Sequence, residues 1–269
     1  MYQEKVQVLC NKKVGPKYYK IGLKCHRGYL DAKPGQFIML RLVDQTLPLL
    51  RRPFSIHKLI MNKGAVEGIE LLYKVVGECT RKLSGLKNGD VVDIVGPLGN
   101  GFIIPDNFHR IFLVAGGIGV APMLFLASSF QKRNVDPLKC VVFIGGRSKT
   151  DLLCVDDFIN LGIKVHVTTD DGSVGDKSFV THPLEIEVNK KKPDVIFACG
   201  PLEMLRCVVN IAKAHTVPCQ VSIETIMACG IGACLGCAVE SKETANKYKH
   251  ACIDGPVFDA KILKLEAGI

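Results

Sequence analysis

Four cysteines near the carboxyl end of the sequence constrain the fold of this chain more than any other feature. Cys229, Cys234 and Cys237 are separated by four and then two residues, and Cys252 follows after 14 more. Their sulfur atoms can surround one common group only if the chain folds tightly between them. Any fold proposed for this chain must therefore bring residue 252 back to the 229–237 segment.

The spacing and the intervening residues favour an iron–sulfur cluster. A C-x4-C-x2-C run with one distant cysteine is typical of plant-type 2Fe–2S proteins. Gly230, Gly232, Ala233 and Gly236 let backbone N–H groups approach the cluster sulfur atoms. Structural zinc sites usually combine two C-x2–4-C pairs, so zinc fits this lopsided spacing less well, and unligated thiols are a third alternative. We predict that the four cysteines ligate a 2Fe–2S cluster.

Composition limits the class of protein and its surroundings. The 269 residues suffice for about two domains, and 48% hydrophobic residues exclude a disordered chain. Residues 1–5 contain no apolar signal segment, so we expect a cytoplasmic protein with reduced thiols. The net charge is +9, but residues 190–192 form the only run of three basic side chains. Without a basic stripe we predict no nucleic-acid partner, and a surface that attracts phosphate-bearing cofactors.

The N-terminal part of the sequence predicts a β-barrel. Short β-rich runs are bounded by Gly, Pro and Asn, with one short helical segment near residues 79–86. These runs are KVQVLC, FIMLRLV, GIELLYKVV and DVVDIVG, at residues 5–10, 37–43, 68–76 and 90–96. The glycine-rich residues 96–101 that follow are expected to form a linker or a cofactor-facing loop.

The middle of the sequence alternates strands and helices. Apolar strands are expected at RIFLVAG, CVVFIGG, IKVHVTTDDG and DVIFACG, and helices over residues 120–133, 151–162 and 201–215. This pattern predicts a doubly wound parallel sheet with helices on both faces. Residues 111–130 carry no charge and are long enough to span a membrane, but four Gly and Pro residues interrupt them. We interpret them as a strand, a turn and a buried helix, and expect no membrane association.

Two groups of residues in the barrel region have the chemistry of a flavin site. Arg52, in the run RRPFSI, offers a forked guanidinium to a diphosphate, and Phe54 offers a flat apolar face. The segment Leu72-Tyr73-Lys74 follows about 20 residues later, and after it Thr80 and the amides near it could open a helix that binds an anion. Each piece alone is weak, since Arg-Pro-Phe-Ser is more often a strand edge.

Two small-residue turns follow strands of the predicted parallel sheet. Gly116-Gly117-Ile118-Gly119 comes after the first strand, and Cys199-Gly200-Pro201 after a later one. Either could be no more than a tight corner between a strand and a helix. Because ligands bind at the carboxyl ends of such strands, the two turns together indicate one cofactor site.

These motifs, taken in order, resemble those of the ferredoxin–NADP reductase superfamily. The series is RPFS, G-x-x-T at residues 77–80, GGIGVAPM and CGP. The C-terminal MACGIGACLGC and ACIDGPVF resemble more closely the electron-transfer subunits of two-subunit, NAD-dependent dihydroorotate dehydrogenases. The resemblance spans nearly the whole chain. It implies an α+β multidomain protein, with an antiparallel β-barrel FAD domain (1–101), a doubly wound parallel α/β NAD domain (102–220) and a 2Fe–2S segment (221–269).

The resemblance also implies the cofactor-binding residues. FAD would be held by Arg52, Pro53, Phe54, Ser55, Leu72, Tyr73, Lys74, Gly77, Cys79 and Thr80. NAD, as substrate, would dock against Gly116, Gly117, Gly119, Cys199, Gly200 and Pro201. The family usually has Gly where this chain has Cys79, which would narrow the room for the diphosphate. We assign no catalytic acid or base, because hydride transfer between nicotinamide and flavin needs orientation only.

The partner implied by the resemblance is a catalytic dihydroorotate dehydrogenase subunit that carries FMN, in a heterotetramer with two copies of each chain. Electrons would pass from dihydroorotate through FMN, the 2Fe–2S cluster and FAD to NAD⁺, in pyrimidine biosynthesis. One alternative is a subunit of an NAD(P)H–ferredoxin or sulfide dehydrogenase, although those relatives commonly have Asp where this chain has Cys229. A zinc or redox sensor is another. The basic loop at residues 145–149 leaves NADP open as an alternative to NAD.

Overall fold

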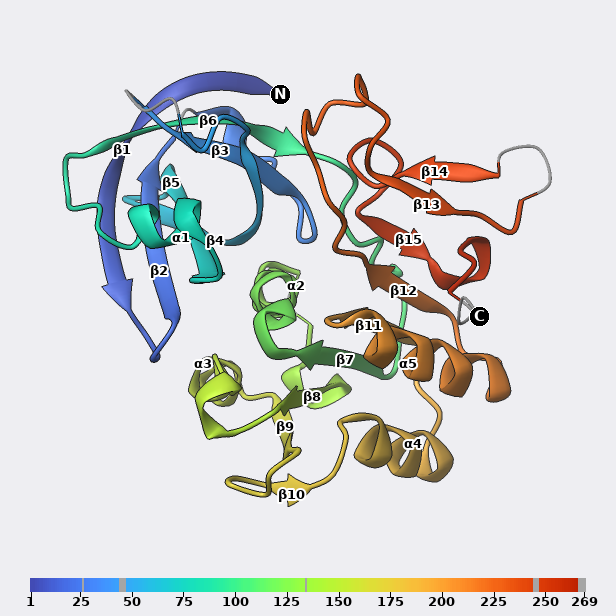
Figure 1. The fold of residues 1–269 in the computed structure, drawn as a ribbon. Helices are drawn as coiled ribbons and strands as arrows, with labels where there is room; N and C mark the ends of the chain where they lie inside the picture. Colours follow the sequence, from blue (N-terminus) through green and yellow to red (C-terminus); the bar gives the residue numbers. More distant parts are fainter. Residues whose placement is uncertain (26, 44–46, 134, 244–246, 266–269) are drawn as a thin grey trace.

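A closed antiparallel barrel forms the N-terminal part of the computed structural model, which describes residues 1–25, 27–43, 47–133, 135–243 and 247–265 (Figure 1). Alternate strand residues such as Ile38, Leu40 and Ile56 fill its interior. Helix α1 (Glu78–Leu83) follows the fifth strand. The strand order is β1-β2-β5-β4-β3-β6, with bounds β1 (Tyr2–Lys13), β2 (Tyr18–Lys24), β3 (Phe37–Leu42), β4 (Arg52–Asn62), β5 (Ala65–Lys74) and β6 (Val91–Leu98).

The second sheet is parallel except at one edge. Its order is β10-β9-β8-β7-β11-β12-β15, and only β15 runs antiparallel to its neighbour. The bounds are β7 (Ile111–Gly116), β8 (Cys140–Gly146), β9 (Lys164–Thr169), β10 (Asp176–Lys177), β11 (Val195–Cys199), β12 (Cys219–Ser222) and β15 (Val257–Asp259).

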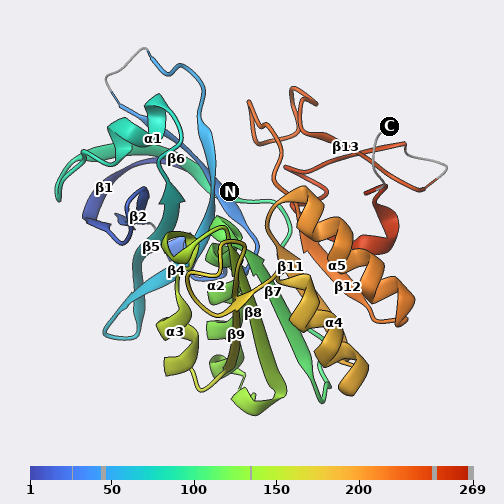
Figure 2. The same cartoon turned by 60° about the horizontal axis from the view of Figure 1, so that its bottom comes forward.

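Helices cover both faces of this sheet, as predicted (Figure 2). On strand β7, Leu113 faces α2 (Val120–Lys132) and α3 (Val155–Asn160), whereas Phe112 faces α4 (Thr181–Lys190) and α5 (Leu202–Ala214). Short 3₁₀ helices connect the elements: η1 (Arg27–Tyr29), η2 (Gly117–Gly119), η3 (Pro137–Lys139), η4 (Lys149–Asp151) and η5 (Ala260–Ile262).

The uncharged segment 111–130 is strand β7, the turn η2 and most of α2, as predicted. In the described parts of the chain, no helix has the length and apolarity needed to cross a membrane. The helix expected over residues 151–162 is wrong over its first four residues. There Asp151 bonds to the barrel and Cys154 adopts a left-handed backbone, so α3 begins only at Val155.

The C-terminal segment connects the barrel to the parallel sheet. Strands β13 (Ala238–Glu240) and β14 (Tyr248–His250) form a hairpin, and β15 then pairs with β12. A single buried cluster includes Met39 and Leu98 of the barrel, Phe258 of the sheet, and Cys237 and Cys252. The three domains therefore share hydrophobic core. Their boundaries at 101 and 220 remain predictions, and strand β12 runs across the second of them.

A buried histidine marks the contact between the barrel and α2. His57, on β4, is fully buried, and its Nδ1 donates to the Ala121 carbonyl at 3.0 Å. Beside it, Lys20 on β2 pairs with Asp157 on α3 at 3.2 Å. Burial lowers the pKa of His57 to about 4, from an ordinary value of 6.5. The folded protein therefore holds the His57 imidazole in its neutral form at neutral pH.

We expect this contact to weaken in acid. Between pH 6.5 and 4 the unfolded chain protonates His57 and the folded chain does not, so acidification favours unfolding. From pH 7.5 to pH 5.5 the loss due to this group is about 1.3 kcal/mol. Urea unfolding of the wild type and of His57→Gln at both pH values measures it. The variant should be less stable at pH 7.5 but lose less on acidification; equal losses in both proteins would show that His57 is not the titrating group.

Candidate functional site

A cavity of about 660 Å³ lies between the barrel, the N-terminal end of α2 and the carboxyl ends of β11 and β12. All ten residues predicted to hold FAD line it, from β4, β5 and the turn into α1. Of the six predicted NAD residues, Gly119 and Cys199 line the same cavity. Gly200 and Pro201 line a neighbouring cavity between α5 and the C-terminal hairpin. The volume is in the usual range for cofactor sites.

Two cations of the cavity wall are held in different ways. The Arg52 guanidinium donates to the carbonyls of Leu50 and Arg51, at 2.8 and 3.2 Å. Lys74 lies 5.0 Å from the centre of the Tyr18 ring and 3.4 Å from Asp151 of the NAD domain. The hydrogen bond with Tyr18 and the nearby Asp151 carboxylate raise the pKa of Lys74. Both side chains supply positive charge where a diphosphate would bind.

The turn before α1 differs from the expectation of an open anion site. The Thr80 hydroxyl accepts hydrogen bonds from the amides of Val76 and Gly77, at 2.9 and 3.1 Å, and donates to the Gly77 carbonyl. These groups are therefore satisfied within the turn, and α1 has only six residues. Cys79 lines the cavity, and burial raises the pKa of its thiol, which favours the neutral form.

The two small-residue turns are in direct contact. A Cβ atom on Gly119 would lie 2.3 Å from the Cys199 carbonyl oxygen and 2.8 Å from the Gly200 amide nitrogen. A Cβ atom on Gly116 would lie 2.8 Å from Pro201 Cδ. Strands β7 and β11 are neighbours, so their ends bring the turns together as predicted. These glycines are thus required by the packing of one turn on the other, whereas Gly117 faces open space.

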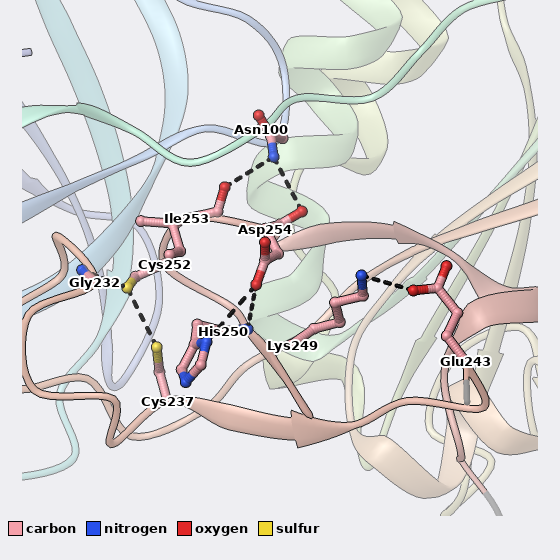
Figure 3. Close-up of polar contacts among 9 residues, drawn as sticks. All are labelled: Asn100, Gly232, Cys237, Glu243, Lys249, His250, Cys252, Ile253 and Asp254. Atoms are coloured by element: carbon pink, nitrogen blue, oxygen red, sulfur yellow. Dashed lines mark hydrogen bonds and ion pairs between the residues drawn. The ribbon is translucent and has the colours of Figure 1, made fainter. Parts of the chain in front are cut away.

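The four cysteines form two pairs in segments that adjoin the cavity wall, since Met227 and Pro256, which line the cavity, are two and four residues from Cys229 and Cys252. Cys237 Sγ is 3.3 Å from Cys252 Sγ (Figure 3). The Cys234 main-chain amide donates to Cys229 Sγ at 3.4 Å. Across residues 1–265, apart from the undescribed positions, no three His, Cys, Asp or Glu side chains converge as ligands of a single ion. A 2Fe–2S cluster has two irons, each with two protein ligands, so two pairs fit it better than one tetrahedral zinc.

Backbone amides surround the sulfur atoms. Ile231 N–H donates to Cys229 Sγ at 3.5 Å, and Gly232 N–H donates to Cys252 Sγ at 3.1 Å. Partial burial opposes ionisation of Cys229, but the amides of Ile231 and Cys234 lower the pKa of its thiol to about 6. Gly232 has a φ of 78°, in the left-handed region that favours glycine. The donor set therefore fits a thiolate-ligated cluster.

The deeper thiol pair is less ready to ionise without a metal. Burial, followed by the adjacent Cys237, raises the pKa of Cys252 to about 12. Positive charge on iron would be needed to hold it as a thiolate.

Sequence reasoning assigned no role to the segment between β12 and the first cysteine. Ser222, Ile223, Glu224, Thr225 and Met227 line the cavity. Residues around Glu224 remove part of its hydration, which raises the pKa of its carboxyl. The strand CQVS was a sequence signal that could have indicated this segment, because the carboxyl end of that strand lies at the same sheet edge as the two turns.

Asn100 was also missed, although its glycine-rich loop was singled out. Its side-chain amide donates to the carbonyls of Ile253 and Asp254, next to Cys252 (Figure 3).

The fold and the site define a flavin-dependent oxidoreductase of the ferredoxin–NADP reductase type with an added iron–sulfur segment. Three family models match consecutive parts of the chain. They are an oxidoreductase FAD-binding domain (8–102), an oxidoreductase NAD-binding domain (113–210) and the iron–sulfur cluster binding domain of dihydroorotate dehydrogenase B (224–264). The three predicted cofactor domains are therefore confirmed.

Individual relatives agree. The chain is 39% identical to the dihydroorotate dehydrogenase B (NAD⁺) electron transfer subunit of Caldanaerobacter subterraneus subsp. tengcongensis, covering 97% of this chain and 98% of the relative. It is 40% identical to the subunit of the same name from Clostridium acetobutylicum, covering 92% of each. The chain belongs to the family of dihydroorotate dehydrogenase B electron transfer subunits.

Solved structures give the same fold. An NADH-dependent reduced ferredoxin–NADP oxidoreductase matches with a TM-score of 0.82 and 29% identity, covering 97% of this chain and 90% of that one. A ferredoxin NADP⁺ reductase from Neisseria gonorrhoeae matches with a TM-score of 0.67 and 15% identity, covering 80% of this chain and 92% of that one, which supports the fold alone.

The contact between the two turns predicts a steric effect. Gly119→Ala places a methyl group against the Cys199–Gly200 backbone and should destabilise the protein by about 2 kcal/mol, as other overpacked sites do. Gly77→Ala is the matched control, because nothing lies within 4 Å of the added atom. Urea unfolding of both variants measures the difference. Equal stabilities would mean that the turns can separate without loss.

Proposed function

We propose that this chain carries electrons from the FMN of a partner dihydroorotate dehydrogenase subunit to NAD⁺, through its own 2Fe–2S cluster and FAD. The observation that carries the proposal is the placement of two cysteine pairs beside the cavity of the FAD-binding barrel, in a chain of this family. When bound, FAD exchanges two electrons with NAD and one at a time with a cluster, which neither neighbour can do alone.

The residues of the chain act by binding and orientation. Arg52 and Lys74 neutralise the diphosphate of FAD, and Phe54 and Tyr73, in edge contact at 6.0 Å, support its rings. The paired turns at Gly119 and Cys199 receive the nicotinamide on the opposite wall. The cysteine pairs would hold the two irons of the cluster. The chain needs to supply no proton donor, because hydride transfer between nicotinamide and flavin would depend on orientation alone.

NAD is the proposed nicotinamide cofactor. An acidic loop lies against the basic loop at residues 145–149. The main-chain N–H groups of Asp170 and Asp171 donate to the carbonyls of Gly146 and Arg147. The two carboxylates offset the attraction that Arg147 would exert on the extra phosphate of NADP. We place the protein in the cytoplasm, because assembly of the cluster needs thiols and all twelve cysteines are free.

The partner subunit is proposed to dock over the cysteine loops. Ile226, Ile231, Leu235 and Ile253 lie in the segments that carry the cysteines, and each is about half or more exposed. Apolar side chains gathered around a redox centre suit a protein interface that excludes water. The partner's FMN would then approach the cluster from this side.

A second candidate is electron exchange with a ferredoxin. The structural match to a ferredoxin–NADP oxidoreductase is the observation that favours it. Cys229 argues for the first candidate, because relatives of the second kind commonly have Asp at this position.

The purified protein tests the proposal. We expect flavin absorption, 2Fe–2S absorption and about two irons and two acid-labile sulfides per chain. With its catalytic partner it should reduce NAD⁺ with dihydroorotate, and Cys252→Ser should abolish that reaction while FAD remains bound. A colourless protein with one zinc would refute the proposal, and faster NADP⁺ reduction by ferredoxin would select the second candidate.

The docking surface gives a separate prediction. Ile226→Glu places a charge on a side chain that is 88% exposed near the cysteines, and should weaken binding of the catalytic subunit about tenfold or more. Leu138→Glu is the control, since Leu138 is 83% exposed but lies before β8, at the opposite end of the sheet. Surface plasmon resonance on the holo-protein compares them. Equal affinities of the two variants for the catalytic subunit would show that the subunit binds to another surface.

A further inference from the structure

The loop that leaves the barrel is bonded to the loop that contains Cys252. Asn100 Nδ2 donates to the carbonyls of Ile253 and Asp254, both at 3.0 Å, and the Asn100 amide donates to the Gly255 carbonyl. Figure 3 shows the side chain pointing onto this loop from the end of the barrel. We propose that Asn100 is a positioning residue that holds the Cys252 loop on the FAD-binding barrel and so fixes the cluster site relative to the flavin cavity.

The Asn100 loop is itself fastened to the barrel. Gln36 Nε2 donates to the Gly99 carbonyl at 2.8 Å, and the Phe102 amide donates to the Pro34 carbonyl at 2.8 Å. Gly99 has a φ of 70°, and a Cβ atom there would lie 2.6 Å from the Gly255 carbonyl oxygen. The two loops therefore approach at backbone distance. Asn100 is consequently joined to the barrel on one side and to the Cys252 loop on the other.

Other hydrogen bonds of the Cys252 loop join it to the first cysteine loop or lie within it. The Ala251 amide donates to the Cys237 carbonyl, and Gly232 N–H donates to Cys252 Sγ. The amides of Ile253 and Asp254 donate to the His250 carbonyl at 3.0 and 2.8 Å, and the Asp254 carboxylate accepts from the His250 amide at 2.6 Å. These bonds set the shape of the loop but do not attach it to the barrel. The loop is attached to the barrel by the hydrogen bonds of Asn100 and by the apolar packing of Cys252 with Met39 and Leu98, whereas strand β15 joins it to the parallel sheet.

The first cysteine loop has its own contact with the barrel. A Cβ atom on Gly230 would lie 2.4 Å from Met39 Cγ, so that loop rests on strand β3. This contact does not involve Asn100, whereas the Cys252 loop receives two side-chain hydrogen bonds from Asn100 in addition to its apolar packing. Loss of the Asn100 side chain should therefore loosen the Cys252 loop more than the first cysteine loop.

The expected consequence is local. Electron transfer slows steeply as the separation of the redox centres grows, so a loosened Cys252 loop should affect the cluster more than the flavin. With both cofactors bound, NADH would supply two electrons as a hydride to the flavin site, and single electrons would pass from there to the cluster site. The first step involves the cavity and the paired turns, and only the second crosses the contact made by Asn100.

The test compares Asn100→Ala and Asn100→Asp with Gln220→Ala in the FAD- and cluster-loaded protein. Gln220 is a matched control, because its amide bonds to Ile103 N–H and C=O at 2.9 and 2.7 Å and ties the same connecting segment to β12. Asn100→Asp keeps the size of the side chain but turns a carboxylate toward two carbonyls. Iron release to a chelator, the EPR spectrum of the reduced cluster and anaerobic stopped-flow reduction by NADH are measured for each protein.

Both Asn100 variants should release iron about tenfold faster than the wild type, the size expected for the loss of two hydrogen bonds. Cluster reduction should slow while flavin reduction is unchanged, and Gln220→Ala should match the wild type. Asn100 variants that behave like Gln220→Ala, or that lose FAD together with the cluster, would overturn the inference. The inference rests on the proposed 2Fe–2S site, and a wild-type protein without iron would refute that proposal first.

Discussion

The rest of the structure depends on the packing of the cysteine segment into core shared by the barrel and the parallel sheet. Met39 and Leu98 of the barrel, Val221 and Phe258 of the sheet, and the side chains of Cys237 and Cys252 belong to one buried cluster. A mobile cluster segment would leave this apolar surface exposed to water, at a cost of about 25 cal/mol per Å². The same contacts that bury the thiols hold the flavin cavity and the cluster site at a constant separation.

Buried polar groups restrict how the domains can be arranged. Asp151 of the NAD domain bonds to both Tyr18 and Lys74 of the barrel. A carboxylate of the NAD domain therefore holds the Lys74 ammonium group in place on the wall of the flavin cavity. His57 and the Lys20–Asp157 pair mark the same interface further along. Apolar packing alone tolerates sliding, whereas each of these bonds is satisfied in one arrangement only. The angle between the two sheets is therefore set by hydrogen bonds as well as by burial.

Much of this architecture was predictable from the sequence, for identifiable reasons. The barrel strands at residues 37–43 and 90–96 and helix α2 have clear apolar patterns, and all ten predicted flavin residues line one cavity. Helix α4 escaped prediction because THPLEIEVNK has few apolar residues. The prediction of helix at the start of residues 151–162 failed because Asp151 bonds to Tyr18 and Lys74, which lie more than 70 residues away in the sequence. The role of Asn100 was equally hidden, since its acceptors are 153 and 154 residues further along the chain.

The pairing of β15 with β12 has a consequence for how the folded protein avoids association with other chains. Strand β12 would be the exposed edge of the parallel sheet if β15 were absent, and an unpaired edge invites such association. The covering strand, at residues 257–259, follows Cys252 by only a few residues. One short segment therefore both covers the sheet edge and carries the fourth cysteine. Displacement of this segment would expose the edge of the α/β sheet and withdraw Cys252 at the same time.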